Sequence, residues 1–398
     1  MFKDKTALLF VCISFICGLC GAFFYPLSSL FIVQELGASP MMLSVYMVAA
    51  VGSSVAVSHY IAKRSDKNWN RKSILVVSLS SYFITVTSFV FIRDYWTAVA
   101  VVILFGSVSG ASFGQLFALG REYGDRYVSN STNFLAVMRA GLAIAWVFGP
   151  PIAFMLNAKF GFSAAFAVSS VTVLIGIILA AKFVPGQVVS KQEKSESPEI
   201  NKPLGGMVVL YCLILVCAFG ANNLYITSMP LYLSQELMVN PSWLGLLFGM
   251  AAACEIPVML TAGSLANRLG AVRLMIIAAL SGVGFYLVML SQTSFIAMLI
   301  AQVFNGFFIG VWATIGMVAL QDMMKDRLGT ASTLFSNMLS VSTLVSSLAV
   351  GVIGELYDYY SALYVSLAGL VVAVGLLALF EVKSKPVCEA MQYQASEG

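Results

Sequence analysis

The sequence predicts an all-α integral membrane protein in which twelve transmembrane helices form two pseudo-symmetric six-helix bundles. Of its 398 residues, 60% are hydrophobic and 10% are charged, whereas a soluble domain carries about 25% charged residues. The apolar residues fall in long blocks separated by short polar segments, and each block reaches the roughly 20 residues that cross a bilayer. The composition therefore excludes a soluble globular protein.

Hydropathy divides these blocks into six spans on each side of a polar segment. The spans are expected at residues 6–33, 41–62, 73–92, 96–119, 132–156 and 162–184, and then at 206–234, 242–266, 272–290, 294–320, 330–354 and 359–380. The segment between the halves is rich in Lys, Glu, Ser and Pro, a composition typical of a flexible linker. The expected domains are an N-terminal bundle at 1–184, a linker at 185–205, a C-terminal bundle at 206–381 and a tail at 382–398.

Lysine and arginine residues lie almost entirely on one side of the predicted spans. Of the 22 in the chain, only Arg93, Lys159 and Arg139 lie elsewhere. Because basic loops stay on the cytoplasmic side, this asymmetry places both termini, the linker and the tail in the cytoplasm. An even number of spans meets the same requirement. The net charge of +4 follows from this orientation and does not indicate nucleic-acid binding.

Three features recur at equivalent places in the two halves. Gln34-Glu35-Leu36 before the second span matches Gln235-Glu236-Leu237 before the eighth. Pro26 in the first span matches Pro230 in the seventh, and a basic loop follows both the second and the eighth span. Repeats of this kind place the substrate site of a transporter near the membrane midplane, between the halves.

Two charged residues, Arg139 and Glu255, lie inside the predicted spans and away from their ends. A charge at the centre of a span costs about 2.5–3.5 kcal/mol on insertion scales, so it normally faces a cavity or a partner. Trp146 lies seven residues beyond Arg139, close to two helical turns, and therefore shares its face. We expect Arg139 and Trp146 to face a central cavity. Glu255 is expected to bind substrate or to carry a proton, or else to pack beside Pro257.

The arrangement of six plus six spans resembles the major facilitator superfamily. That family carries the signature Gly-x-x-x-Asp-Arg-x-Gly-Arg-Arg or Lys in a cytoplasmic loop. Between spans eight and nine, GSLANRLGAVR keeps Arg268 and Arg273 and has Asn267 in place of Asp, and AKRSDKNWNRK after span two keeps Arg64 and Asp66 but lacks the glycines. The resemblance implies that both loops gate the cytoplasmic side. The alternative is that their charges only set the orientation in the membrane.

Two stretches of the N-terminal half carry a closer resemblance, to the bacterial sugar efflux transporter (SET) family. They are QLFALGREYGD at residues 115–125 and VMRAGLAIAWVFGPPIAFML at residues 137–156. This resemblance implies a transporter of the bacterial inner membrane that exports glucosides, galactosides or related small sugars by proton-coupled alternating access. Gly149-Pro150 is also similar to a span-five motif of antiporters in the superfamily, which favours export.

The resemblance further implies a sugar site around Arg139. Glu122, Arg139 and Trp146 are placed similarly to the glutamate, arginine and tryptophan that hold the sugar in lactose permease. Charged groups offer strong hydrogen bonds to hydroxyls, and an indole stacks on a sugar ring. The alternative for Glu122 and Arg139 is a structural ion pair that closes the cytoplasmic side. Glu255 resembles an acidic sugar ligand of lactose permease, but the arginine and histidine partners found there are missing from spans nine and ten.

Neutral amides inside the spans can complete a sugar site. Buried amides can equally bond one helix to another, for a fraction of a kcal/mol up to about 2 kcal/mol. The amides expected to contact sugar are those of Gln115, Asn222, Asn223 and Asn305.

The sequence shows no motif of an enzyme. It lacks the phosphate-binding pattern GxxxxGK[ST], so ATP-driven pumping is not indicated, and nearly all of its seven cysteines lie in apolar segments, where they act as small hydrophobes. We expect no enzymatic activity, no cofactor, no metal and no nucleic acid, and a monomer whose partners are a small sugar, the proton and the lipid bilayer. Two alternatives stay open. One is a multidrug/proton antiporter of the same fold, favoured by the many aromatic and Met residues, and the other is a non-transporting sugar sensor.

Overall fold

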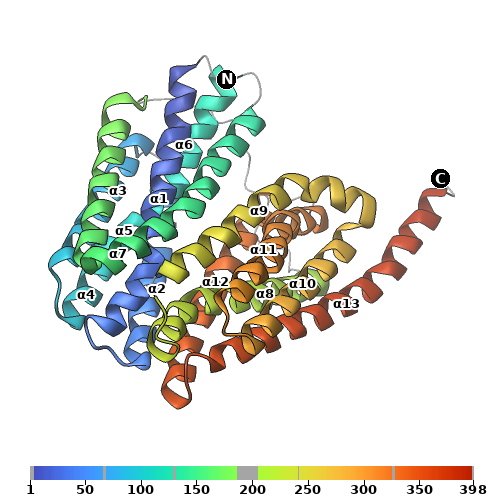
Figure 1. Ribbon diagram of the computed structural model, residues 1–398. Helices are drawn as coiled ribbons and strands as arrows, with labels where there is room; N and C mark the ends of the chain where they lie inside the picture. The colour runs from blue at the N-terminus through green and yellow to red at the C-terminus, as the bar shows by residue number, and fades with distance from the viewer. Residues whose placement is uncertain are drawn as a thin grey trace. The chain divides into compact units, whose positions relative to one another are not determined.

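The computed structural model describes residues 4–65, 69–128, 131–185, 205–240, 242–324 and 328–396 (Figure 1). In these ranges the chain is helical apart from short connections, and it contains no β-strand. Eleven of the described helices are long and apolar enough to cross a membrane. The predicted all-α membrane fold is therefore confirmed.

The first half of the chain contains helices that correspond to the first six predicted spans. The fourth predicted span is built of three helical pieces, and a π-helical turn, η1, joins the first two. The elements are α1 (Lys5–Gln34), α2 (Pro40–Ser65), α3 (Arg71–Phe91), α4 (Tyr95–Val101), η1 (Val102–Gly106), α5 (Ser107–Ser109), α6 (Ala111–Tyr127) and α7 (Ser131–Phe183).

Helix α7 contains two membrane spans. Its 53 residues rise about 80 Å at roughly 1.5 Å per residue, whereas the hydrocarbon core of a bilayer is about 30 Å thick. The helical geometry breaks at Gly161, where φ is 81° and ψ is 173°, a conformation that glycine adopts without the clash that a Cβ would cause. The chain turns there, between the predicted fifth and sixth spans. Counting α7 twice turns the eleven long helices into the twelve spans that were predicted.

The second half follows the same order of spans. Helix α13 continues beyond the predicted end of the last span, although the apolar part of this helix ends at Val382. The elements are α8 (Gly206–Leu231), the π-helical turn η2 (Tyr232–Glu236), α9 (Ser242–Leu269), α10 (Ala271–Ser291), α11 (Phe295–Met323), α12 (Leu328–Leu356) and α13 (Ser361–Ser396).

The chain divides into two compact units. The first unit holds Met1–Glu193, Ile226–Ala253 and Ser347–Tyr359. The second holds Lys194–Tyr225, Cys254–Ser346 and Tyr360–Gly398. Helices α8, α9 and α12 therefore each contribute one part to each unit. The boundaries predicted from the sequence at 184, 206 and 381 stay predictions.

Helix α1 packs along α7 in the first unit (Figure 1). A Cβ added to Gly18 would lie 2.9 Å from the carbonyl oxygen of Leu142, and one added to Gly149 would lie 2.5 Å from the Cβ of Ala22. Small residues let helix backbones approach closely in this way in membranes. Buried aromatic rings fill the neighbouring space between α1, α3 and α7, with centroids 5.0–5.8 Å apart among Phe24, Phe31, Phe89 and Phe166.

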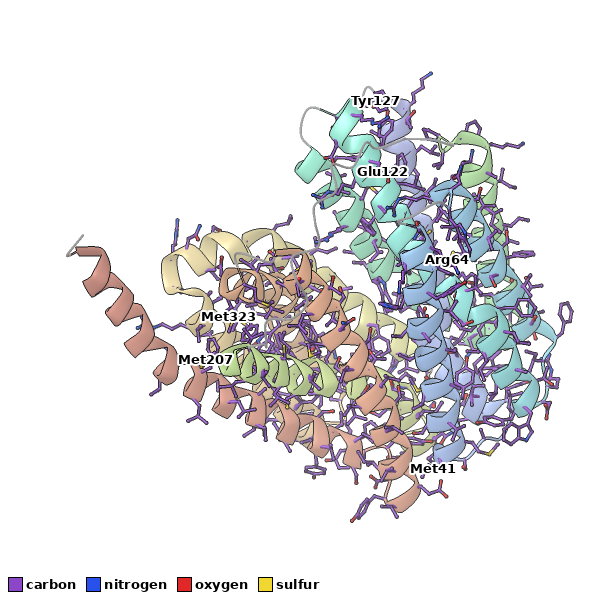
Figure 2. The ribbon with its side chains drawn as sticks, turned by 180° about the vertical axis from the view of Figure 1, so that it is seen from behind. Met41, Arg64, Glu122, Tyr127, Met207 and Met323 are labelled. Atoms are coloured by element: carbon purple, nitrogen blue, oxygen red, sulfur yellow. The ribbon has the colours of Figure 1, made fainter. Side chains whose placement is uncertain are left out.

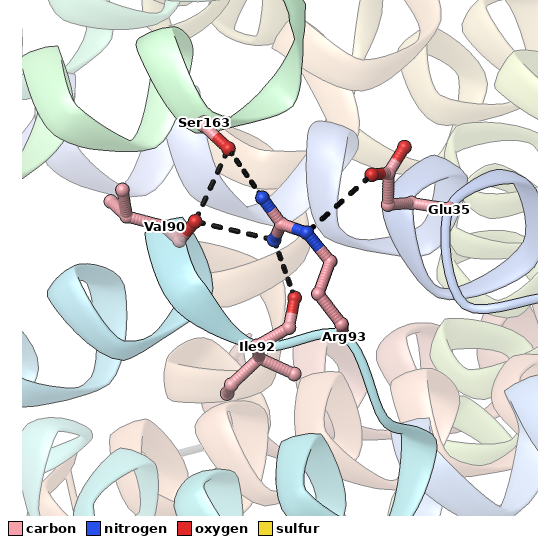
Figure 3. A network of polar contacts seen from close by, with 5 residues as sticks. All are labelled: Glu35, Val90, Ile92, Arg93 and Ser163. Atoms are coloured by element: carbon pink, nitrogen blue, oxygen red, sulfur yellow. Dashed lines mark hydrogen bonds and ion pairs between the residues drawn. The ribbon is translucent and has the colours of Figure 1, made fainter.

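The guanidinium of Arg93 joins three helix ends on the side predicted to be extracellular (Figure 3). Its Nη1 donates to the carbonyl oxygens of Ile92 at 2.6 Å and Val90 at 3.2 Å, and Nη2 donates to Ser163 Oγ at 3.0 Å. Nε lies 3.8 Å from Glu35 Oε1. Arg93 thus ties the ends of α1 and α3 to the part of α7 that follows Gly161.

The second copy of the Gln-Glu-Leu repeat also uses its glutamate to hold a connection. Glu236 Oε1 accepts a 2.6 Å hydrogen bond from the backbone N–H of Tyr359, just before α13. The two glutamates of the repeat, Glu35 and Glu236, therefore have structural contacts on the same predicted side of the membrane.

Candidate functional site

The first part of α7 has two packing faces within the first unit. Met138 contacts α6, where a Cβ at Gly120 would lie 2.6 Å from Met138 Sδ. The segment from Leu142 to Gly149 contacts α1, where a Cβ at Gly18 would lie 2.9 Å from Leu142 and Ala145. Another face of α7 contacts α9. A Cβ at Gly245 would lie 2.5 Å from the Cα of Pro151.

Arg139 and Trp146 lie on the face of α7 between these two contacts. At 3.6 residues per turn, both lie roughly a quarter to a third of a turn from the residues that contact α1 and from Val147 and Pro151, which contact α9. The Arg139 side chain is exposed, and that of Trp146 is half-buried. Among the described residues, Arg139 has no ion-pair or hydrogen-bond partner. Its guanidinium donors are thus available to a ligand, with an indole about two turns farther along the same face.

The structure brings Glu122 to Arg71 rather than to Arg139. Glu122 Oε1 lies 2.8 Å from Arg71 Nε, and the two side chains are 19% and 16% exposed. Figure 2 shows Glu122 toward the same end of the chain's first half as Tyr127, whereas Met41 lies at the opposite end. The pair joins the last turns of α6 to the first residue of α3. The sequence did contain a signal for this pair. The third and fourth spans run antiparallel, so the end of the fourth span lies beside the start of the third.

A second contact at this end involves the start of α1. Asp4 caps α1 by accepting hydrogen bonds from the backbone N–H groups of Thr6 at 2.9 Å and Ala7 at 3.3 Å. Its other carboxylate oxygen accepts a 2.6 Å hydrogen bond from the Tyr123 hydroxyl. These bonds, the Tyr123 bond above all, hold the pKa of Asp4 below its ordinary value.

Two of the expected amides hold helices together. Ser65 donates to the buried Oε1 of Gln115 at 2.9 Å, which joins α2 to α6. Asn223 Nδ2 donates to the hydroxyls of Ser342 and Thr343, both at 3.1 Å, which joins α8 to α12. Gln115 and Asn223 thus make the helix-to-helix contacts that the structural alternative predicts for buried amides.

The other two expected amides differ from this pattern. Asn222 is buried, and within the described ranges its side chain makes no polar contact. Asn305 Nδ2 donates to Gln302 Oε1 at 3.4 Å, and Gln302 Nε2 donates to the Tyr225 hydroxyl at 3.1 Å. The buried Oδ1 of Asn305 has no protein partner in the part of the chain that is described.

Glu255 is half-buried in the second unit. Its carboxylate has no ion pair or hydrogen bond with any described residue. A Cβ at Gly310 would lie 3.0 Å from the Glu255 carbonyl oxygen, so the missing side chain of Gly310 lets α11 approach the backbone of α9 here. Among the described residues, the Glu255 carboxylate is therefore without a protein partner inside a predicted span.

The helices that follow the two predicted gating loops, α3 and α10, begin in different ways. Gly270 starts α10 with φ at 88°, which explains why the signature carries a glycine there. In the first loop, Asn70 caps α3 by accepting from the backbone N–H groups of Lys72 at 2.9 Å and Ser73 at 3.3 Å. A side-chain cap therefore replaces the glycine that the first loop lacks.

The charged residues of these loops are mainly exposed. Arg64 lies with its guanidinium carbon 5.4 Å from the centre of the Tyr60 ring, and Arg273 Nε lies 3.6 Å from Glu381 Oε1. Asn267 and Arg268 are exposed. Asp66 lies outside the described residues.

Sequence reasoning missed the contacts that α9 and α12 make in the first unit. A Cβ at Gly249 would lie 2.7 Å from Pro151 Cγ, and Ser44 of α2 donates to the carbonyl oxygen of Ser347 in α12. Gly351 follows one turn later against the Ser44 side chain. The four-residue spacing of Gly245 and Gly249 was the sequence signal for such close packing.

Comparisons with known proteins match this architecture over nearly the whole chain. The family model described as Major Facilitator Superfamily matches residues 10–212 and 211–390. Sugar efflux transporter A of Escherichia coli (strain K12) is 33% identical over 374 residues, covering 93% of this chain and 94% of that protein. Sugar efflux transporter C of the same strain is 30% identical, covering 93% and 95%.

Solved structures share the fold at low sequence identity. The nucleoside transporter NupG aligns with a TM-score of 0.76 at 14% identity and covers 95% of this chain and 99% of its own. A bacterial homologue of the iron transporter ferroportin, in an inward-facing state, aligns with a TM-score of 0.73 at 15% identity and covers 96% and 99%. These two likenesses concern the fold alone.

Proposed function

The chain belongs to the sugar efflux transporter family of the major facilitator superfamily, and on this premise we propose that it exports small sugars across the bacterial inner membrane in exchange for protons. Its substrates would be glucosides, galactosides or related saccharides, and both of its termini would be cytoplasmic. The observation that carries the proposal is the Arg139 guanidinium, which has no partner among the described residues and lies on the same face of a membrane helix as Trp146. A lipid-spanning segment rarely keeps an unpaired arginine without a functional reason.

Arg139 and Trp146 supply the two kinds of contact that a sugar ring needs. The planar guanidinium donates two parallel hydrogen bonds to adjacent hydroxyl oxygens. The indole offers an apolar face for the C–H groups of the ring and a single N–H donor. We assign Glu122 to the ion pair with Arg71 and leave Asn222 as the amide of the second unit with the greatest freedom to bind sugar.

Transport by alternating access requires the contacts within the first unit to separate. Gly245 and Gly249 lie against Val147 and Pro151 of α7, and Gly351 lies against Ser44 of α2. These contacts fall on the side of the spans predicted to be extracellular, so a sugar leaving the cell would pass only after they open. We propose that Glu255, whose carboxylate has no partner among the described residues, takes up the proton that drives the exchange.

Everted membrane vesicles test the proposal directly. Labelled methyl glucoside, methyl galactoside and lactose are followed with and without an imposed proton gradient. We expect gradient-dependent uptake of at least one sugar, and its loss in the Glu255→Gln variant. Sugar equilibration that ignores the gradient would refute the exchange with protons. Transport of a cationic drug with no transport of sugar would instead favour the multidrug antiporter.

A further inference from the structure

A small pocket lies inside the first unit, between α1, α3 and the segment from α5 to α6. Its polar lining comes from two thiols, two tyrosines and two serines, which belong to Cys17, Cys20, Tyr25, Tyr82, Ser109 and Ser112. The pocket has a cavity volume of about 20 Å³, within about 300 Å³ of empty space that includes open solvent. This cavity volume exceeds the roughly 10–15 Å³ that one water molecule needs and is too small for a sugar ring. It therefore differs from the site proposed at Arg139.

The two thiols belong to one face of one helical turn. Cys17 and Cys20 are three residues apart in the uninterrupted helix α1, and both line the pocket. Side chains with this spacing are neighbours, with Cβ atoms about 5–6 Å apart, whereas a disulfide needs Cβ atoms about 3.5–4.5 Å apart. The helix therefore presents the two side chains to one pocket as neighbouring thiols rather than as a disulfide.

Neighbouring groups fix the walls around this pair. The Tyr82 hydroxyl donates a 3.0 Å hydrogen bond to the carbonyl oxygen of Cys20, which binds α3 to α1. Ser109 donates to the Gly106 carbonyl oxygen at 2.6 Å. Tyr25 also lines the pocket and is 53% exposed, so the pocket reaches an exposed side chain. The two cysteines themselves are 4% and 2% exposed, so a ligand would reach their thiols only through this pocket.

We propose that Cys17 and Cys20 form a dithiol site that binds one thiophilic centre, represented by trivalent arsenic. Soft thiol ligands select soft centres, and arsenous acid, As(OH)₃, is small and uncharged at neutral pH. Two S–H bonds and two As–O bonds break, two As–S bonds form, and the two protons leave with the two hydroxides as water. The product is a cyclic (RS)₂AsOH adduct, and arsenic stays trivalent. The site does not depend on the proposed transport of sugar.

Arsenite binding to the purified full-length chain tests this assignment. After incubation with sodium arsenite in detergent, native mass spectrometry should detect one arsenic atom per chain. Labelling with a small maleimide before denaturation should then modify two thiols fewer than in the untreated chain. The Cys17→Ser and Cys20→Ser variants should each bind arsenite about 100-fold more weakly, because a single thiol loses the gain from two linked contacts.

A second pair of cysteines provides the matched control. Cys212 and Cys217 also lie in a membrane helix, α8, but five residues apart and therefore on different faces. Their double replacement by serine should leave the arsenic stoichiometry and affinity unchanged. Cys17→Ala and Cys20→Ala replace the serine variants if those unfold, as judged by the thermal midpoint in detergent. Unchanged binding without either pocket thiol, or no arsenic on the folded native chain, would overturn the proposal.

Discussion

The ion pair between Arg71 and Glu122 gives the sharpest test of whether Glu122 binds sugar or has a structural role. If Glu122 is structural, then Glu122→Gln should destabilise the protein and leave its affinity for sugar unchanged. If Glu122 binds sugar, the same substitution should weaken binding. The two roles therefore predict opposite outcomes for one variant.

The size of the effect follows from the geometry of the pair. The two atoms lie 2.8 Å apart, and the side chains are 16% and 19% exposed, so the charges are only partly solvated. A hydrogen bond to a charged group contributes about 1.5–3 kcal/mol, whereas exposed ion pairs contribute about 0.2–1 kcal/mol. We expect a coupling of about 2 kcal/mol between Arg71 and Glu122, which is roughly a 30-fold change in the unfolding equilibrium constant.

A double-mutant cycle measures this coupling. Arg71→Gln, Glu122→Gln and the double variant are unfolded in detergent micelles, and the difference in free energy of unfolding isolates the pair. The adjacent pair of Arg121 and Asp125 is the matched control. Their atoms lie 3.9 Å apart on side chains that are 74% and 55% exposed, so we expect a coupling below about 0.5 kcal/mol. Equal coupling in both pairs would refute the reasoning, as would lost sugar affinity in a stable Glu122→Gln protein.

Three further predictions follow from other parts of the structure. Arg139→Lys should keep the unfolding midpoint but weaken sugar binding about 10-fold, since an ammonium lacks the planar fork of donors; unchanged affinity by titration calorimetry would contradict this. Gly249→Leu should reduce vesicle transport below about a tenth, because even a Cβ there would lie 2.7 Å from Pro151 Cγ and the contact could not close; wild-type transport would disprove it. The pKa of Asp4 is lowered in the folded state, chiefly by the Tyr123 hydrogen bond, so its stabilisation is present above the ordinary pKa of 3.8 and is lost as pH falls through the folded pKa. Unfolding midpoints measured from pH 6 down to about pH 2 should fall more steeply for the native chain than for Asp4→Asn, and parallel curves would count against it.

Hydropathy was sufficient to predict the membrane spans because a lipid-spanning helix needs a long apolar segment and little else. The twelve predicted spans correspond to the described helices, including the two spans that meet at Gly161. The boundary between Leu156 and Phe162 could be predicted because a bilayer limits the length of a span, and the helical geometry breaks there at Gly161.

The partners of charged and polar side chains were harder to predict. Sequence spacing specifies which face of its own helix a residue occupies, but it does not specify how that helix is rotated against its neighbour. Glu122 contacts Arg71 for this reason. Asn223 and Asn222 are adjacent in sequence and equally polar, yet only Asn223 reaches the hydroxyls of α12. An amide that binds sugar and an amide that joins two helices have the same chemistry, so only the position of the amide in the fold distinguishes the two roles.

The different starts of α3 and α10 have a consequence for how the two halves tolerate mutation. Asn70 works through a side-chain oxygen, and Ser, Thr or Asp can supply one at a small cost. Gly270 works through its backbone, at φ of 88°, where every residue with a Cβ is strained. A saturation library should therefore recover several residues at position 70 and almost only glycine at position 270. Equivalent loops of a repeated fold should thus accept different sets of amino acids, with the wider set in the loop whose helix is capped by a side chain.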